Sequence, residues 1–564
     1  MAPVMAQVMA PVMAPVMARA LATLAQVLAL LVLGTAAQVQ AAADPAKVLR
    51  VELRGAESTL DPARASDVYS GALVQAIYES PLAYDYAARP LQLVPALLEQ
   101  LPVSPDGGRT WPLALRSGLQ FAPDPVFGPQ QTRAITADDL RYSLERLKDA
   151  QVQSPFRWLW TEHLARITVQ DRLHLTLILQ TPDPQFLPML ALAACAVVPR
   201  EIAGRSADAL GGHPVGSGPY LLAQWQHGSH FSLLANPRYR ARRTASGRPI
   251  PAIGRVEVQV IDEPQSAWLS FRRGELDLLW LQDVLAPVAL ASVDATFRVD
   301  RMPNPVLNYF TFNVRDADWG GMQAGRVALR RAVLMAIDDQ AYVREVREGQ
   351  AQALDWPVPP GLPGAWPGYH GVLGFDPAAA RSLLDQFAYR VCQPATGLRC
   401  RPDGRQLTLR VAGRANSMGR SEIEFLRRAL AAIGVQLVQQ PLQVADYIKS
   451  ARACQLQFSR ADWFADLPRA DDFFQLLSAR KVGTVNYSCF DDVTWDAQFA
   501  QAVQMQDAPA RQAAYARLAR QAELLGVWKP SHASVRNTLV RARVRDFQAH
   551  PFYWSVWQYL DLDP

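Results

Sequence analysis

A strand–helix–strand pattern at residues 407–438 constrains the fold of this chain more than any other local feature. Two β-prone apolar runs, 407–411 and 435–438, enclose a helical segment that Ser421 opens and Gly434 ends. The apolar residues that recur on one helical face are Ile423, Leu426, Leu430 and Ile433. Strands joined through one helix form a right-handed crossover, so the pattern predicts a layered α/β protein.

The rest of the chain repeats this alternation. Residues 48–53 and 256–261 alternate as strands, and residues 264–273 read as a helix that stops at Gly274. Thr136 is placed as an N-cap with an acidic residue, Asp139, three positions later. We expect α/β layers along most of the chain.

Composition excludes several classes of protein. The chain has 564 residues, of which 50% are hydrophobic and only 19% are charged, with a formal net charge of +5. This length predicts several domains or lobes with a large core, and the composition excludes a disordered protein or a coiled coil. We find no run of five or more like charges, which argues against a nucleic-acid partner.

The first 43 residues resemble a leader and not part of a fold. Arg19 precedes an apolar run at 20–37, and a small-residue stretch at 41–43 offers a cleavage site, as in a secretory signal peptide. The alternative is an uncleaved membrane anchor, because the run is nearly long enough to span a bilayer. Met17 offers a second start, so residues 1–16 can be an extension that is not translated. We expect cleavage and export.

The five cysteines suit an oxidising compartment. Cys392 and Cys400 flank a short polar loop, and we predict a disulfide between them. A second pairing that we consider is Cys454 with Cys489, while Cys195 lies in an apolar run and is expected to be a buried free thiol. No cysteine or histidine pair has zinc-ligand spacing, so we predict no metal site.

A search for catalytic chemistry finds no nucleophile elbow, phosphate-binding loop or HExxH metal motif. The acidic pairs, of which Asp471 with Asp472 is one, are adjacent in sequence and diverge on a helix, so we interpret them as caps or solvated faces. We therefore predict neither an enzyme nor a cofactor, although a triad assembled from distant residues stays open as a secreted hydrolase.

An ordered series of short motifs resembles the bacterial extracellular solute-binding proteins of family 5, the receptors of ABC importers. In the first half these motifs lie at residues 58–62 (STLDP), 77–82 (IYESPL), 95–99 (PALLE), 104–107 (SPDG), 115–121 (LRSGLQF), 135–146 (ITADDLRYSLER) and 215–220 (VGSGPY). In the second half they lie at 309–313 (YFTFN), 326–338 (RVALRRAVLMAID) and 375–384 (FDPAAARSLL). The order makes the resemblance specific, although each motif is short.

The segment 463–471 (WFADLPRAD) resembles the family's "W-x-ADYPDP" motif. In oligopeptide-binding members the aspartate after that alanine holds the α-ammonium of the peptide, a role that maps to Asp466. Leu467, Arg469 and Ala470 depart from the motif, and Arg469 could instead attract an anionic group of a ligand.

The resemblance implies a periplasmic binding protein fold of type II, cluster C, with two lobes, an inserted extra domain and a hinge. The expected lobe I comprises residues 44–86, 214–304 and 531–564, the insert 87–213, and lobe II 305–530. The hinge crossings are expected near residues 304–313 and 531–538.

The resemblance also implies a function. We expect a periplasmic substrate-binding component of an ABC importer, a monomer that holds a di- or oligopeptide between its lobes and passes it to the permease–ATPase complex. The residues that we expect to contact the ligand are Asp466, Trp463, Phe464, Trp356, Trp366 and Tyr309. The same fold with haem, a nickel complex or a sugar as ligand is the alternative.

Overall fold

The computed structural model describes residues 43–563, apart from residues 207, 241, 245, 246, 282–284 and 416. The predicted signal peptide therefore lies outside the described residues, except for Ala43. Within the described part of the chain, no helix combines the length and the apolar character needed to cross a bilayer.

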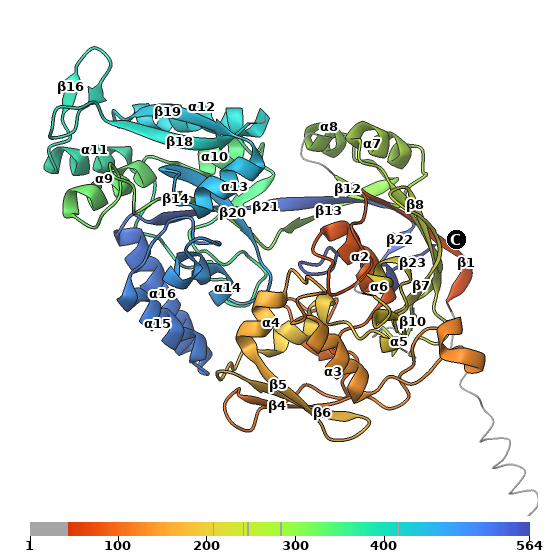
Figure 1. The fold of residues 1–564 in the computed structure, drawn as a ribbon. Coiled ribbons are helices and arrows are strands. Elements are labelled where there is room, and N and C mark those ends of the chain that lie inside the picture. Colours follow the sequence, from red (N-terminus) through yellow and green to blue (C-terminus); the bar gives the residue numbers. More distant parts are fainter. Residues whose placement is uncertain are drawn as a thin grey trace, which may run out of the picture.

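A twelve-stranded mixed sheet runs through both lobes, in the order β19-β18-β20-β14-β21-β12-β1-β11-β8-β7 with β13 and β15 paired to β21 (Figure 1). Strand β21 (Trp528–Arg541) pairs with β14 (Val306–Phe312) near its start, and with β12 (Leu278–Leu281) and β13 (Phe297–Pro303) towards its end. One long strand therefore belongs to both lobes. We call the part around β1, β7, β8, β11 and β12 lobe I, and the part around β14 and β18–β20 lobe II.

In lobe I, strand β1 (Asp44–Leu53) lies parallel to β11 (Ile253–Val260), which continues antiparallel into β8 (His230–Ala235) and β7 (Tyr220–Gln226). Helix α2 (Val68–Ile77) packs on this sheet through apolar residues such as Leu73.

The end of helix α2 approaches the loop before β7 very closely. A Cβ atom at Gly216 would lie 2.3 Å from the carbonyl oxygen of Ile77, and one at Gly218 would lie 2.5 Å from the Ile77 carbonyl carbon. Only glycine fits at either position. The VGSGPY motif thus holds the helix against the sheet.

The insert has its own core and a three-stranded antiparallel sheet, β4 (Thr110–Ala114), β6 (His174–Leu179) and β5 (Leu164–Val169). Helix α4 (Arg157–His163) and helix α3 (Ala137–Arg146) accompany this sheet, and Thr136 with Asp139 forms the predicted capping box of α3. At the end of α3, Arg146 donates two hydrogen bonds to Asp61 of lobe I, at 3.1 and 2.7 Å. This buried pair joins two of the motifs that carry the family resemblance.

Lobe II contains the predicted crossover. Strands β18 (Thr408–Arg414) and β19 (Gln436–Leu442) are parallel and are joined through helix α12 (Ser417–Ala431). The helix begins four residues before the predicted Ser421. Strand β20 (Phe458–Phe464) pairs with β14 and carries the chain to the inner edge of the lobe.

The remaining helices and short strands surround these sheets. In lobe I and the insert they are α5 (Arg200–Ala203), α6 (Ala209–Gly212), α7 (Pro264–Arg272), α8 (Ala286–Ala291) and the pairs β2 (Leu82–Tyr84) with β3 (Leu93–Pro95), β9 (Arg242–Arg243) with β10 (Pro249–Ile250), and β22 (Val544–Arg545) with β23 (Asp561–Leu562). In lobe II they are α9 (Ala324–Met335), α10 (Asp339–Glu345), α11 (Pro377–Gln386), α13 (Val444–Arg452), α14 (Asp471–Phe474), α15 (Val493–Gln504), α16 (Ala508–Leu524), β15 (Ala351–Ala353), β16 (Val391–Gln393) and β17 (Leu398–Arg399).

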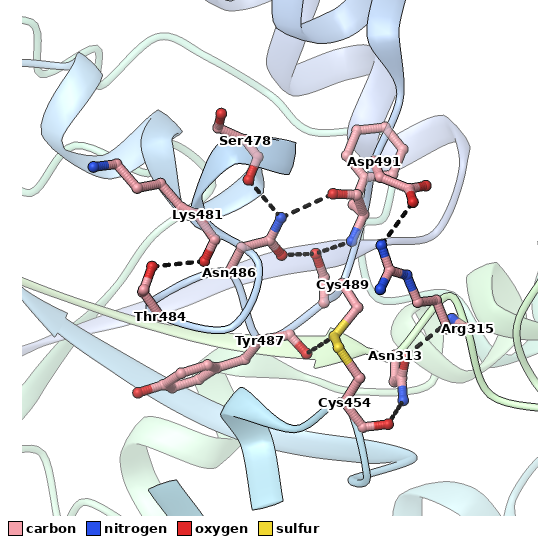
Figure 2. The surroundings of a disulfide bond; sticks show 12 residues. Asn313, Arg315, Cys454, Ser478, Lys481, Thr484, Asn486, Tyr487, Cys489 and Asp491 are labelled. Atoms are coloured by element: carbon pink, nitrogen blue, oxygen red, sulfur yellow. Dashed lines mark hydrogen bonds and ion pairs between the residues drawn. A yellow bond between two sulfur atoms is a disulfide. The ribbon is translucent and has the colours of Figure 1, made fainter. Parts of the chain in front are cut away.

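Two disulfides lie in lobe II. Cys392 and Cys400 join the β16–β17 hairpin, and Cys454 and Cys489 join the end of α13 to the loop before α15. Figure 2 shows the second bridge beside Asn486, whose side-chain amide donates to the carbonyl oxygens of Ser478 and Phe490. Cys195 is buried and free.

Candidate functional site

A cavity of about 420 Å³ lies where lobe I, the insert and lobe II meet. Lobe I lines it with the start of α2 and with residues 552–554, the insert with Phe156 and residues 191–194, and lobe II with residues 464–466. A volume of this size accommodates a small ligand. Because all three parts line the cavity, a ligand held there contacts both lobes.

The lining is aromatic and acidic. Its aromatic members are Tyr84, Phe156, Phe464, Phe552, Tyr553 and Trp554. Its charged members are Asp67 and Asp466, and none of the described residues that line it is an arginine, lysine or histidine. Asp67 caps α2 and accepts hydrogen bonds from the backbone N–H groups of Tyr69 and Ser70. The electrostatics of this cavity therefore favour a cationic group on the ligand.

Asp466 is the carboxylate that is free to bind such a group. It follows strand β20, and its side chain has no hydrogen-bond or ion-pair partner among the described residues. Its backbone N–H donates to Oδ2 of Asp472 at 3.0 Å, which fixes the turn. Burial raises the pKa of Asp466 to about 6, because the charged form has lost most of its water.

Asp472 stabilises the turn that carries Asp466. Its Oδ2 also accepts a hydrogen bond from Nε1 of Trp463 at 2.9 Å, and its Oδ1 accepts one from Nε2 of Gln475. Burial, and then the nearby charge of Asp466, raise the pKa of Asp472 well above its usual value. The interpretation of Asp471 and Asp472 as a cap or solvated face is therefore wrong for Asp472, which is buried and holds the turn that carries Asp466.

Arg469 does not face a ligand, contrary to the expectation that it attracts an anionic group. Its guanidinium is 4% exposed and lies between Asp183 of the insert, at 2.8 Å, and Asp471, at 2.6 Å. It also donates to the carbonyl oxygen of Gln185. The two carboxylates satisfy its charge, so the pair with Asp183 connects lobe II to the insert instead.

The six residues expected to contact the ligand separate into two groups. Asp466 and Phe464 line the cavity, and the Phe464 ring lies 5.4 Å from that of Trp554 in lobe I. Trp463, Trp356, Trp366 and Tyr309 are not among its lining residues. Tyr309 and Trp356 are buried in the core of lobe II, where the indole N–H of Trp356 donates to the Gly364 carbonyl oxygen. The Trp366 ring packs against Trp356.

The sequence did not indicate the lobe I side of the cavity. Tyr553 and Trp554 come from the aromatic segment at the end of the chain, and Asp67 and Gln75 from helix α2. The density of aromatic residues in this segment is the one sequence signal that could have indicated Tyr553 and Trp554 as lining residues. Nothing in the local pattern distinguished Asp67 from an ordinary helix cap.

The comparisons with known proteins agree with this architecture. The family model "Bacterial extracellular solute-binding proteins, family 5 Middle" matches residues 92–484, which is more than half of the chain. The chain belongs to this family. It is therefore a solute-binding protein with the two-lobed periplasmic binding protein fold.

Relatives at low identity include proteins named for different ligands. Heme-binding protein A of Haemophilus influenzae is 23% identical over 83% of this chain and 84% of its own length. Probable di/tripeptide-binding protein 5 of Pseudomonas aeruginosa is 24% identical over 82% of this chain and 85% of its own length. The solved structure of HbpA2 from Haemophilus parasuis superposes with a TM-score of 0.78 at 20% identity, covering 92% of this chain and all of that one.

Proposed function

We propose that this family 5 protein binds a di- or oligopeptide in the inter-lobe cavity, with the peptide α-ammonium on Asp466. The observation that supports this most is the unpartnered Asp466 carboxylate in a cavity whose described lining carries no cationic side chain. The di/tripeptide-binding relative is consistent with such a ligand.

The energetics favour a charged partner for Asp466. An ammonium that enters this cavity loses water at a cost of several kcal/mol, and a facing carboxylate offsets that cost. Removing the carboxylate alone leaves a buried, unpaired ammonium and costs about 3–5 kcal/mol, or two to three decades in Kd. The aromatic lining supplies apolar contact to varied side chains.

In this proposal the protein acts as a periplasmic monomer and performs no chemistry on its ligand. Closure of the lobes about the β13–β14 and β21 crossings encloses the peptide, and the closed form passes it to the permease and ATPase of an ABC importer. The domain limits expected from the sequence, with the insert at 87–213 and lobe II at 305–530, belong to this proposal.

The test compares free and N-acetylated alanine di- and tripeptides by thermal shift and calorimetry. We expect the free peptides to bind and to add about 2.7 kcal/mol of stability at 100 times Kd. Asp466→Asn should lose two to three decades in affinity, while the exposed control Asp446→Asn should bind normally.

Three outcomes would contradict the proposal. Equal binding of acetylated and free peptides would remove the role of Asp466. Stabilisation by haem, a nickel chelate or a sugar, without any by peptides, would establish a different solute. Cleaved peptide in the mixture, seen by mass spectrometry, would establish a hydrolase.

A further inference from the structure

A second cavity, of about 90 Å³, lies in lobe I directly beside the inter-lobe cavity. The two cavities share three lining residues, Val68, Tyr553 and Trp554. The Trp554 indole lies against α2, where a Cβ atom at Gly71 would meet its Cδ1 at 3.1 Å. Trp554 therefore lines both cavities, beside the start of α2.

Two arginines line this second cavity without a carboxylate partner. The guanidinium carbons of Arg54 and Arg536 lie 3.9 Å and 5.3 Å from the ring centre of Trp280. Among the described residues, no carboxylate oxygen lies within 4.0 Å of either guanidinium, and both Nε–H groups are buried without an acceptor. Arg536 is 6% exposed, and its Nη2 donates a hydrogen bond to the backbone oxygen of His550.

The strand register explains why Arg536 lies here. Thr538 of β21 pairs with Trp280 of β12, and two residues further along, Val540 pairs with Leu278 on the face that packs in the lobe I core. Because side chains alternate, Arg536 shares that face. This alternation places the Arg536 guanidinium beside the C-terminal aromatic segment, where it is shielded from water.

The groups that face these arginines offset their charge only in part. Glu52 accepts a hydrogen bond from the Trp280 N–H through Oε1, whereas its Oε2 is buried without a donor. Burial raises the pKa of Glu52 to about 7 although the nearby charge of Arg54 opposes that rise, so Glu52 is partly neutral near neutral pH. Burial, with Arg89 and Arg536 nearby, lowers the pKa of His550 and keeps that ring uncharged. Asp300 of β13 attracts Arg536 only at longer range.

We propose that this second cavity is a subsite for a carboxylate group of the ligand, bound by Arg54 and Arg536. Guanidinium groups present paired N–H donors that match a carboxylate, and buried unpaired charge favours such a partner strongly. A cavity of about 90 Å³ is large enough to admit several water molecules or a carboxylate. The inference rests on the proposed peptide-binding function, and it gives the peptide a second anchor in addition to Asp466.

The carboxylate can come from the peptide C-terminus or from an acidic side chain. Calorimetry with four probes distinguishes these sources: Ala-Ala, Ala-Ala-Ala, Ala-Ala-amide and Ala-Glu-amide. We expect Ala-Ala or Ala-Ala-Ala to bind 10- to 100-fold more tightly than Ala-Ala-amide. Recovery of affinity with Ala-Glu-amide would support the subsite with the side chain as a second source.

The matched variants are Arg54→Gln and Arg536→Gln, with the exposed Arg301→Gln on the neighbouring strand as control. Each of the first two should lower affinity for the free-acid peptides at least tenfold and leave Ala-Ala-amide unchanged, which also shows that the variant is folded. Equal binding of acid and amide, or an acid preference that survives both substitutions, would overturn the subsite and leave the proposed function intact. Failure of every peptide to bind would overturn the proposed function itself.

Discussion

Arg146 and Arg469 are both buried arginines held by aspartates, but they lie at different boundaries of the molecule. Arg146 of the insert pairs with Asp61 of lobe I, and that carboxylate is its one side-chain partner among the described residues. Arg469 of lobe II pairs with Asp183 of the insert and keeps a second carboxylate, Asp471, on its own segment.

The two arginines differ in whether a carboxylate remains beside them when the contact at the boundary breaks. Separating Arg146 from Asp61 leaves a buried cation without compensation, so the insert is expected to stay fixed to lobe I. Separating Arg469 from Asp183 still leaves Asp471 in place, so breaking this contact costs less free energy. If the lobes close as we propose, this contact has to be reversible, and the second carboxylate makes it so.

The largest effect is expected for Asp61→Asn. It should lower the free energy of unfolding by about 3–5 kcal/mol, because Arg146 stays buried and unpaired. Urea denaturation measures this loss, and Asp138→Asn, in an exposed pair with Arg141, should change it by less than about 1 kcal/mol. A loss for Asp61→Asn as small as that of the control would contradict the comparison.

A smaller effect on stability is expected for Asp183→Asn, about 1–3 kcal/mol, because Asp471 still holds Arg469. Its distinguishing effect is on ligand affinity. If the Arg469 contact forms as the lobes close, losing 1 kcal/mol of it weakens peptide binding about fivefold. Calorimetry should show that weakening for Asp183→Asn and not for the folded fraction of Asp61→Asn, and the reverse ranking would refute the assignment.

A third effect, on affinity and not on stability, concerns Asp466, a carboxylate that no arginine pairs with in the described part of the chain. Its raised pKa of about 6 means that it becomes neutral as the pH falls through 6, and a neutral carboxyl does not hold an ammonium. Affinity for Ala-Ala-amide should thus be about tenfold lower at pH 5 than at pH 7. The amide avoids the titration of Glu52 at the carboxylate subsite. If the affinity of the wild-type protein for Ala-Ala-amide does not change between pH 5 and pH 7, the role of Asp466 is contradicted. The Asp466→Asn variant should show no such change.

Local patterns predicted many of the elements. The capping box at Thr136, the helix at 264–273 and the parallel crossover of lobe II follow from caps and apolar spacing, which act over a few residues. The crossover helix begins earlier than predicted because residues 417–420 join its first turn, a boundary that local signals place poorly.

The family and its two-lobed fold could be inferred from the sequence, because the motifs occur in the order typical of the family. Each motif alone is too short to be informative. The position of Asp466 beside a cavity could be inferred in the same way. Side-chain partners could not. Arg469 meets Asp183 from a segment almost three hundred residues away, and Trp280 of β12 and Arg536 of β21 meet Arg54, which follows β1. Burial and pairing depend on contacts between distant segments, which no local spacing encodes, so the charge of the cavity and its neighbouring subsite became visible only once the chain was folded.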